Sequence, residues 1–469
     1  MRINLLGLAV ALLSAGFGSA CSDTQGPGDS GMLGGGTTSS AGNVNATAGA
    51  APLGQAGSSS AAGGSAMGGN SMGGNSMGGG AVAGQSGAGT AGQGTAGGGL
   101  AGGGPVDYDL DCGAAGIVIE GHGPPANRIN YVIVGDGYDQ ADVDGGLYLQ
   151  HVMAMIDGRG EPGTNDYVPG RFGSEMEPYR TYRNFINICA LKVVSVDSGI
   201  VSGTDSGGCP GPPDTAFDGC GDDTSRLGHI NRNKVDAALA QLAPADMEVD
   251  WVGVMMNDSE WWNSGSNPMV WSGGHPDAAL AAQHEGGHGF QDLSDEYGGC
   301  PGSRINVTGN SLTTEGKWSH WLGFNQDPGT GEQLVRKCDG DRWAPTEESV
   351  MNSLWNSPYF NAISLENAVR IIYEMVRPID SHTATSVTTP QLLEVRVVDP
   401  ALIGVDWSVD GVVVAPNGGG SFDVAARGLT SGSHSITARA HDDTPWVPPD
   451  TPHGRQDLEQ EVEWTIQVP

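Results

Sequence analysis

The sequence predicts an α/β (α+β) domain with a mixed, twisted sheet, followed by a small all-β sandwich. Three observations support this class. Apolar strand-like runs alternate with helical runs between residues 128 and 257. An alanine-rich helical stretch follows at 277–293, and residues 383–469 contain only short alternating runs separated by Gly, Pro and Asp.

The first 21 residues are predicted to be a signal peptide. Arg2 precedes the apolar run INLLGLAVALLSAGFG, which is too short to span a membrane, and small residues then lead to Cys21. This ending resembles the lipobox of bacterial lipoproteins, in which the cysteine carries the lipid, with Gly18 at the usual leucine position. Ordinary cleavage near Ala20 is the alternative. We expect an outer-membrane or cell-surface lipoprotein, or else a secreted protein.

Residues 22–105 are predicted to be a disordered tether. They are almost purely Gly, Ala, Ser, Asn, Gln and Thr, and they contain no basic or aromatic residue. Such a segment cannot bury enough apolar surface to offset the entropy lost on ordering. A glycine-rich coil of this length spans about 50 Å. Its position directly after the candidate lipobox favours a tether over a passive insertion.

The charge balance limits the partners that can be expected. The formal net charge is −33, from 54 acidic and 21 basic residues. Nucleic acids and anionic membrane surfaces are bound by basic patches, so neither is expected as a partner. Contact with a membrane is expected only through a lipid at Cys21. The acidic excess is compatible with a soluble extracellular protein, including one that binds Ca²⁺.

The cysteines predict disulfides. The chain has seven cysteines, and without Cys21 an even set of six is left for an exported protein. Three disulfides are expected, although sequence cannot choose among the fifteen connectivities. No C-x-x-C pair occurs, which argues against a cysteine-based structural zinc site. The six residues are Cys112, Cys189, Cys209, Cys220, Cys300 and Cys338.

Residues 106–382 are predicted to form the α/β domain. Buried strands are expected within 128–138, 182–196 and 249–257, where apolar residues dominate. Helical spacing of apolar residues occurs at 142–156 and 233–243. The predicted helix at 277–293 begins at Pro276 and Asp277, which are residue types common at helix N-termini.

Residues 383–469 are predicted to form a separate β-sandwich. Short alternating strands are expected in the stretches LLEVRVVD, VDWSVDGVVV, GSFDVAARG, GSHSITARAHD and EVEWTIQVP. The pattern fits a small sandwich of immunoglobulin-like type. The disulfide typical of such domains is missing, because no cysteine lies beyond Cys338.

The stretch AAQHEGGHGFQDLSDEYGG carries the candidate catalytic residues. His284 and His288 are four residues apart on the predicted helix, so both imidazoles can bind one ion. Glu285 lies beside them, where it can act as general base without being a ligand. Two histidines, an oxygen ligand and an open position favour one catalytic Zn²⁺ over manganese or iron. A chance match on an exposed helix face is the alternative.

The third ligand has to come from beyond the helix. Ser294 stands ten residues after the first histidine, where many such sites have a third histidine. Asp295 follows it, but on a continuous helix it would lie about 16 Å further along the axis than His284. The helix must therefore break after His288, at Gly289 or around Asp292.

Several carboxylates could complete the site. Asp295 is our choice, and Glu296 is the second choice. Asp292 is too near the helix to reach round. Glu315, or a glutamate on a later helix, is the other alternative.

These motifs resemble the IgA peptidase family of zinc metallopeptidases, metallopeptidase family sixty-four, among the metzincin-like zincins. The resemblance implies a zincin-like catalytic domain with an active-site helix and a Met-turn beneath the metal. Four motifs occur in the family's order: GDGY at 135–138, the site motif from His284 to His288 with Leu293, Asp295, Glu296 and Tyr297, the pair Trp318 and Trp321, and Met351 as the Met-turn residue.

We therefore expect a secreted or surface-tethered zinc-dependent endopeptidase that acts on proteins or peptides. Zinc is expected to polarise the scissile carbonyl, and Glu285 to take a proton from water and pass it to the leaving amine. Two rivals stay open: a non-catalytic surface binding protein on a zincin fold, and a zinc hydrolase of a non-peptide substrate. The intact Glu285 and histidines count against the first rival. Substrate identity is not encoded in any motif of the chain.

Overall fold

The computed structural model describes residues 108–469, apart from 161–167, 173–175, 202–210, 310–316, 322–335, 339–341, 354–358 and the single positions 224, 266, 319, 348, 450 and 452. The predicted signal peptide, Cys21 and the tether lie outside these residues. All described residues belong to one compact unit. None of the described helices is long and apolar enough to cross a membrane.

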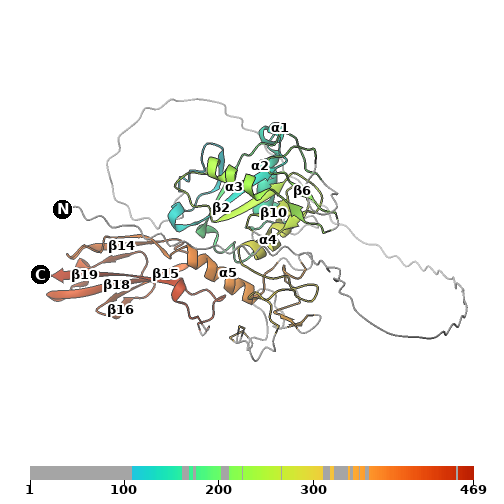
Figure 1. The fold of residues 1–469 in the computed structure, drawn as a ribbon. Helices are drawn as coiled ribbons and strands as arrows, with labels where there is room; N and C mark the ends of the chain where they lie inside the picture. Colours follow the sequence, from blue (N-terminus) through green and yellow to red (C-terminus); the bar gives the residue numbers. More distant parts are fainter. Residues whose placement is uncertain are drawn as a thin grey trace, which may run out of the picture. The chain divides into compact units, whose positions relative to one another are not determined.

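A mixed sheet of six strands, in the order β1-β5-β2-β8-β10-β9, forms the centre of the N-terminal part (Figure 1). β5, β2, β8 and β10 run parallel to one another, and each edge strand is antiparallel to its neighbour. The predicted mixed α/β arrangement is thus confirmed. The strands are β1 (Gly116–Glu120), β2 (Ile129–Asp136), β5 (Ile186–Leu191), β8 (Trp251–Met256), β9 (Asn263–Ser264) and β10 (Met269–Ser272).

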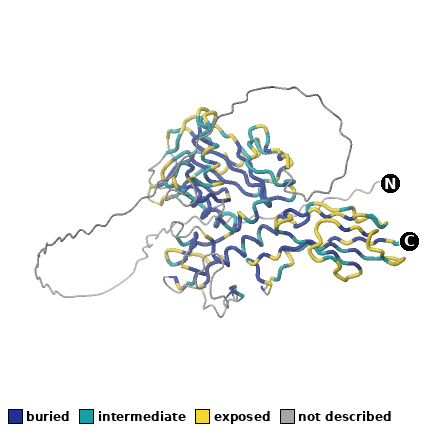
Figure 2. Tube along the Cα trace, turned by 180° about the vertical axis from the view of Figure 1, so that it is seen from behind, coloured by how far each residue is buried: buried dark blue, intermediate teal, exposed yellow. Residues whose placement is uncertain are grey.

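Strand β2 shows why the sheet carries helices on both faces. Every residue of β2 is buried, as the dark central strands in Figure 2 illustrate. Alternate side chains enter two different cores, because successive residues of a strand point to opposite faces. Tyr131 and Ile133 share a core with α2 (Leu147–Asp157) and α4 (Ala278–Gly289). Val132 and Val134 share the other core with α3 (Arg232–Leu242).

The helical spacing at 142–156 is divided between two helices. α1 (Gln140–Asp144) begins with a capping box at Asp139, in which the Asp139 side chain and Asp142 hold each other's backbone amides. Gly145 caps its end, and Gly146 then takes a left-handed conformation with φ 84° before α2 starts. The glycine pair therefore separates two helices where the apolar spacing alone would predict a single one.

The GDGY motif at the end of β2 anchors a loop. The buried Asp136 carboxylate accepts hydrogen bonds from the backbone amides of Phe217 and Gly219, both at 2.8 Å, and from the Thr215 hydroxyl at 3.1 Å. Burial raises the pKa of Asp136, and these hydrogen bonds partly offset the effect. The motif thus has a structural role.

Two described disulfides tie loops to the fold. Cys112–Cys189 joins the segment before β1 to β5, and Cys300–Cys338 closes the region after α4. Cys220 is also disulfide-bonded, and Cys209 lies outside the described residues. The short pairs of this part are β3 (Gly158–Arg159) with β4 (Val168–Pro169), β6 (Cys220–Gly221) with β7 (Gly228–His229), and β11 (Arg336–Lys337) with β12 (Trp343–Ala344). The short 3-10 helices are η1 (Pro125–Asn127) and η2 (Arg183–Phe185).

The C-terminal part contains a three-stranded sheet, β13-β14-β17, and a four-stranded sheet, β16-β15-β18-β19. All their pairings are antiparallel. Trp407 stacks on Phe422 of the other sheet at 5.1 Å between ring centroids. The immunoglobulin-like type stays a prediction. The strands are β13 (Ile379–His382), β14 (Leu392–Val397), β15 (Ile403–Val409), β16 (Val412–Ala415), β17 (Ser421–Asp423), β18 (Gly432–Asp442) and β19 (Glu459–Val468), with η3 (Ala425–Arg427) and η4 (Gln456–Leu458).

Helix α5 (Ala362–Met375) connects the two parts. One continuous hydrophobic core includes residues of β2, α4, α5 and the C-terminal sheets. Polar contacts join the same parts: Asn184 donates to Asp399 at 2.8 Å, and Tyr182 and Tyr373 donate to Asp442 at 2.6 and 2.8 Å. The residues on either side of position 382 thus share one interior.

Candidate metal centre

Helix α4 places two histidines on one face. Its first residues are mainly alanine, and it starts directly after Asp277, as the sequence predicted. The Nε2 atoms of His284 and His288 lie 3.2 Å apart, and their ring centroids lie 4.8 Å apart. Both ring edges therefore face the same point.

Backbone carbonyls orient both rings. The Nδ1 atom of His284 lies 2.8 Å from the Val350 carbonyl oxygen, and Nδ1 of His288 lies 2.8 Å from that of Leu293. A carbonyl oxygen only accepts, so each Nδ1 carries the hydrogen and donates it. In the neutral imidazole the Nε2 lone pair is then left to bind a cation, which is the usual arrangement of metal-binding histidines.

The chain turns back after α4 and brings Asp295 to the histidines. The helix ends at Gly289, and Asp292 takes a left-handed conformation with φ 54°. The Leu293 amide closes the turn on the Gly287 carbonyl at 2.9 Å. Asp295 Oδ1 then lies 3.1 Å from His288 Nε2 and 3.3 Å from His284 Nε2. The expected helix break is present, with its bend at Asp292.

The other candidate ligands lie elsewhere. Glu296 is buried, and its carboxylate accepts hydrogen bonds from Asn306 and Asn361. Asp292 is exposed and pairs with Arg304. Glu315 lies outside the described residues.

Burial and charge act together on His288 and Asp295. Burial by itself lowers the pKa of His288, but the carboxylates of Asp295 and Glu285 outweigh it and raise this pKa to about 9. Burial by itself raises the pKa of Asp295, but hydrogen bonds from His284 and His288 bring it well below its usual value. The carboxylate is therefore held in its anionic, ligand-competent form.

The donor set fits a metal ion. One ligand atom each from His284, His288 and Asp295 lies within 4.8 Å of the others, and no second group of this kind occurs among the described residues. Two imidazole nitrogens with one carboxylate oxygen are a common protein ligand set for zinc. These three residues could hold a metal and leave a further position open.

Glu285 is held by residues that the sequence did not reveal. Its buried carboxylate accepts a hydrogen bond from the Asn263 amide in edge strand β9. A Cβ atom on Gly265 would lie 2.6 Å from Glu285 Oε2, so a larger residue there would crowd the carboxylate. No spacing signal links these positions to the histidine motif, because the sheet topology alone brings β9 beside α4.

The two glycines between the histidines make room for neighbours. A Cβ on Gly286 would collide with the guanidinium of Arg171, and one on Gly287 would collide with the sulfur of Met351. Met351 is fully buried beneath the helix. The buried Arg171 donates to the Ala282 carbonyl at 2.8 Å and stacks on Trp251 at 3.8 Å. Sequence reasoning missed Arg171, since its isolated position carries no motif.

Residues 168–321 match the family model of IgA Peptidase M64. The match spans α4, Asp295 and the pair Trp318 and Trp321, and it leaves out Met351. This segment belongs to the IgA peptidase M64 family. Membership implies a metallopeptidase, a hydrolase whose substrates are proteins or peptides. A comparison with curated proteins found no match.

The aromatic residues of the M64 peptidase segment divide into core and surface. Trp251, Trp262 and Trp271 are buried and pack the cores, as do Trp318 and Trp321. Tyr297, next to the site, is 49% exposed, and its ring centroid lies 6.3 Å from that of His284. Tyr359, beyond the matched segment, is 37% exposed, so neither tyrosine is buried.

His275 and His320 are not in the cluster. His275 accepts from the Asp277 amide at 3.0 Å and packs edge-on against Trp261. His320 bonds to Glu366 at 2.6 Å. Neither belongs to the ligand group formed by His284, His288 and Asp295.

Proposed function

We propose that this protein is a zinc-dependent endopeptidase in which His284, His288 and Asp295 hold one zinc ion. The observation that carries the proposal is the convergence of their ligand atoms, with contacts of 3.1 to 3.3 Å, inside the segment that matches the M64 family. When bound, zinc would supply a Lewis acid for the scissile carbonyl and for water.

Glu285 acts as general base in this proposal. Glu285 lies on α4, directly before Gly286. The Asn263 side-chain amide orients its carboxylate by donating a hydrogen bond to Oε1. Glu285 would take a proton from water and transfer it to the amine that leaves when the peptide bond breaks.

Replacement of the base tests the mechanism. We expect Glu285→Gln to lower kcat on a denatured protein mixture by about 10²- to 10⁴-fold, because general acid–base catalysis contributes that much. The bound zinc, measured by elemental analysis, should stay at the wild-type level. The exposed Glu374→Gln on α5 is the matched control and should keep full activity.

The outcome also separates the rivals. Full activity of Glu285→Gln would refute the base assignment. A folded, zinc-loaded wild type without cleavage of any protein would favour a binding protein or a hydrolase of a non-peptide substrate. Removal of metal by a chelator and readdition of zinc, manganese or iron then identifies the ion that restores cleavage.

We also propose that the enzyme is exported and tethered through a lipid at Cys21. The support is the signal-like N-terminus followed by the Gly/Ala/Ser-rich segment. Cys21→Ser cannot take a thioether-linked lipid, so this variant should move from the membrane fraction to the soluble exported fraction. An unchanged distribution between the fractions would refute the lipid anchor.

A further inference from the structure

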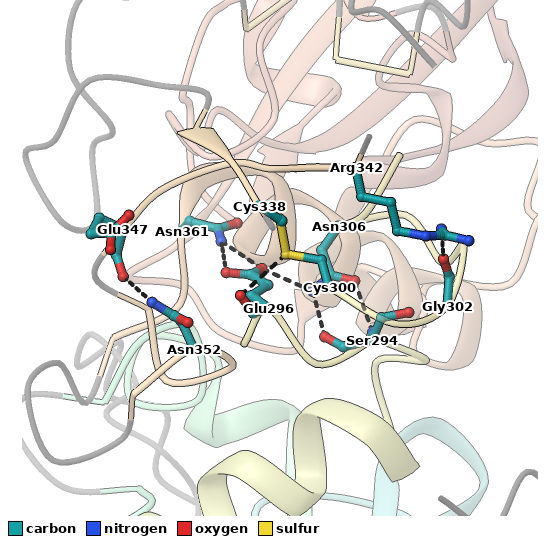
Figure 3. Close-up of a disulfide and its surroundings, with 10 residues drawn as sticks. All are labelled: Ser294, Glu296, Cys300, Gly302, Asn306, Cys338, Arg342, Glu347, Asn352 and Asn361. Atoms are coloured by element: carbon teal, nitrogen blue, oxygen red, sulfur yellow. Dashed lines mark hydrogen bonds between the residues drawn. A yellow bond between two sulfur atoms is a disulfide. The ribbon is translucent and has the colours of Figure 1, made fainter. Parts of the chain in front are cut away.

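Glu296 follows the candidate ligand Asp295 but faces a different set of partners. It is fully buried. Its Oε1 accepts hydrogen bonds from Asn306 Nδ2 at 2.8 Å and from Asn361 Nδ2 at 3.0 Å, and its Oε2 lies 3.2 Å from the same Asn361 nitrogen (Figure 3). Both carboxylate oxygens are therefore engaged away from the histidines.

We propose that Glu296 is a positioning residue, which fixes Asp295 at the metal by fastening its loop to helix α5 and to Asn306. The inference rests on the proposed function, in which Asp295 is a zinc ligand. It assigns to Glu296 a role other than the ligand role that its sequence position first suggested. The acidic pair Asp295–Glu296 then has two separate tasks, one toward the metal and one toward the protein.

The backbone on both sides of Asp295 is held. Asn306 accepts from the Ser294 amide and donates to the Ser294 carbonyl, both at 2.8 Å. The Glu296 amide donates to the Met351 carbonyl at 2.8 Å. With Ser294 and Glu296 both held, Asp295 between them is kept at the histidines, where its Oδ1 lies 3.1 Å from His288 Nε2.

The Met351 segment links the loop to the histidines as well. Val350, the residue before Met351, supplies the carbonyl that orients His284. The loop bearing the third ligand and the first histidine are thus positioned by adjacent residues of one segment. A shift of Glu296 would move the Met351 contact and Asp295 together.

Asn361 is suited to this role because an amide both donates and accepts. Its Oδ1 caps α5 by accepting from the Ser364 amide at 3.1 Å, while its Nδ2 donates to Glu296. Serine or aspartate could cap the helix, but neither offers an N–H donor to a buried carboxylate. A buried carboxylate without donors would be strongly unfavourable. One side chain therefore joins the start of α5 to the ligand loop.

The Cys300–Cys338 disulfide fixes the chain beyond this contact. It lies next to Glu296 and Asn306 in Figure 3, and both cysteines are buried. The loop that follows Glu296 is therefore covalently closed. The disulfide holds the loop after Glu296, and the hydrogen bonds of Glu296 hold the loop at Asp295.

An exchange of amide and carboxylate tests the proposal. In Glu296→Gln, an amide NH₂ meets the Asn361 NH₂, and in Asn361→Asp two carboxylates meet. In the double variant, the new amide at position 296 donates to the new carboxylate at position 361, whose other oxygen still caps α5. We expect each single variant to weaken zinc binding by about ten- to a hundredfold, the usual effect of losing an outer partner of a metal ligand. The double variant should recover to within about threefold of wild type, since the pair couples directly.

The measurement is the zinc dissociation constant of the full chain after chelator treatment, by competition with a chromophoric chelator. Thermal unfolding of each metal-free variant is recorded alongside. Glu374→Gln, on the exposed side of α5, should bind zinc like wild type. Activity is not needed for this readout.

The outcomes separate the two proposals. Lower melting temperatures with unchanged zinc affinity in both single variants would reduce Glu296 to a purely structural residue and overturn the inference. Weak single variants without recovery in the double variant would overturn it too. A folded wild type that binds zinc no better than His284→Ala would instead refute the metal site itself.

Discussion

At the residue scale, packing and not helix propensity explains why positions 286 and 287 are glycine. Alanine is favoured over glycine inside a helix by about 1 kcal/mol, so propensity alone would favour substitution at both positions. The structure leaves no room for a methyl group at either one, because Arg171 and Met351 occupy the space. Arg171 cannot move aside easily, since it is bonded to Ala282 and stacked on Trp251.

Gly286→Ala and Gly287→Ala should each lower the free energy of unfolding by about 1–3 kcal/mol, the usual cost of overpacking a core. Urea unfolding monitored by circular dichroism measures the change. Met351→Ala removes the atom that Gly287→Ala would strike, so this pair combined should cost less than the sum of the single variants. A stability gain from either alanine alone would show that the space is open.

Residue types and spacing identified His284, Glu285, His288 and Asp295 as candidates, and the structure brings the three proposed ligands together. Asn263 and Arg171 could not be found in this way. Each comes from a distant segment and contacts the helix only because the chain folds there.

At the scale of elements, the periodicity of apolar residues was sufficient to predict most of the long strands and helices. The buried strands β2, β5 and β8 and the helices α3 and α4 follow from apolar runs and helical spacing. The two-residue strands β6, β7, β9, β11 and β12 carry no such signal, since two residues do not define a period. β9 matters most among them, because Asn263 lies in it.

The end of α4 shows how a ligand requirement can predict an element boundary. A helix continued to Asp295 would place that carboxylate out of reach, so a break was required. Which residue forms the bend depends on the local backbone conformation. Asp292 adopts the left-handed conformation at φ 54°, whereas Gly289 remains the last helical residue. Aspartate is among the few non-glycine residues that tolerate this region.

At the scale of the whole molecule, Asp442 connects three parts of the chain. Tyr182 follows the loop before η2, Tyr373 lies on α5, and both donate to the buried Asp442 at the end of β18. Burial raises the pKa of Asp442, and the two tyrosine hydrogen bonds offset this only in part. The folded state therefore holds the Asp442 proton more tightly than the unfolded state does.

The sign of the resulting pH dependence is fixed. A raised pKa in the folded state favours folding at pH values below the ordinary aspartate pKa of about 4, and this contribution is lost as pH rises through the raised value. Asp442→Asn carries no titrating group. The unfolding free energy of wild type minus that of Asp442→Asn should thus fall as pH rises above about 4. Urea unfolding at a series of pH values measures this difference.

A constant offset between the two proteins is also expected. The carboxylate of Asp442 accepts from the Thr444 amide with Oδ1 and from the two tyrosines with Oδ2, whereas the amide in Asp442→Asn has a single acceptor oxygen. An unmet donor costs about 1–3 kcal/mol at every pH. The exposed Asp246→Asn should show no pH-dependent difference of this kind. If the Asp442→Asn difference were flat with pH, Asp442 would have the same pKa in both states.

The sequence by itself determined the mixed α/β class, the site helix with its two histidines and proposed general base, and the need for a break before the proposed third ligand. These follow from local periodicity, residue chemistry and chain geometry, which act over short separations. Only the tertiary structure separated Asp295 from Glu296, because the difference depends on Asn306, Asn361 and Met351, residues distant along the chain. Two adjacent carboxylates are alike in sequence, and their different tasks arise from the partners that folding brings to each.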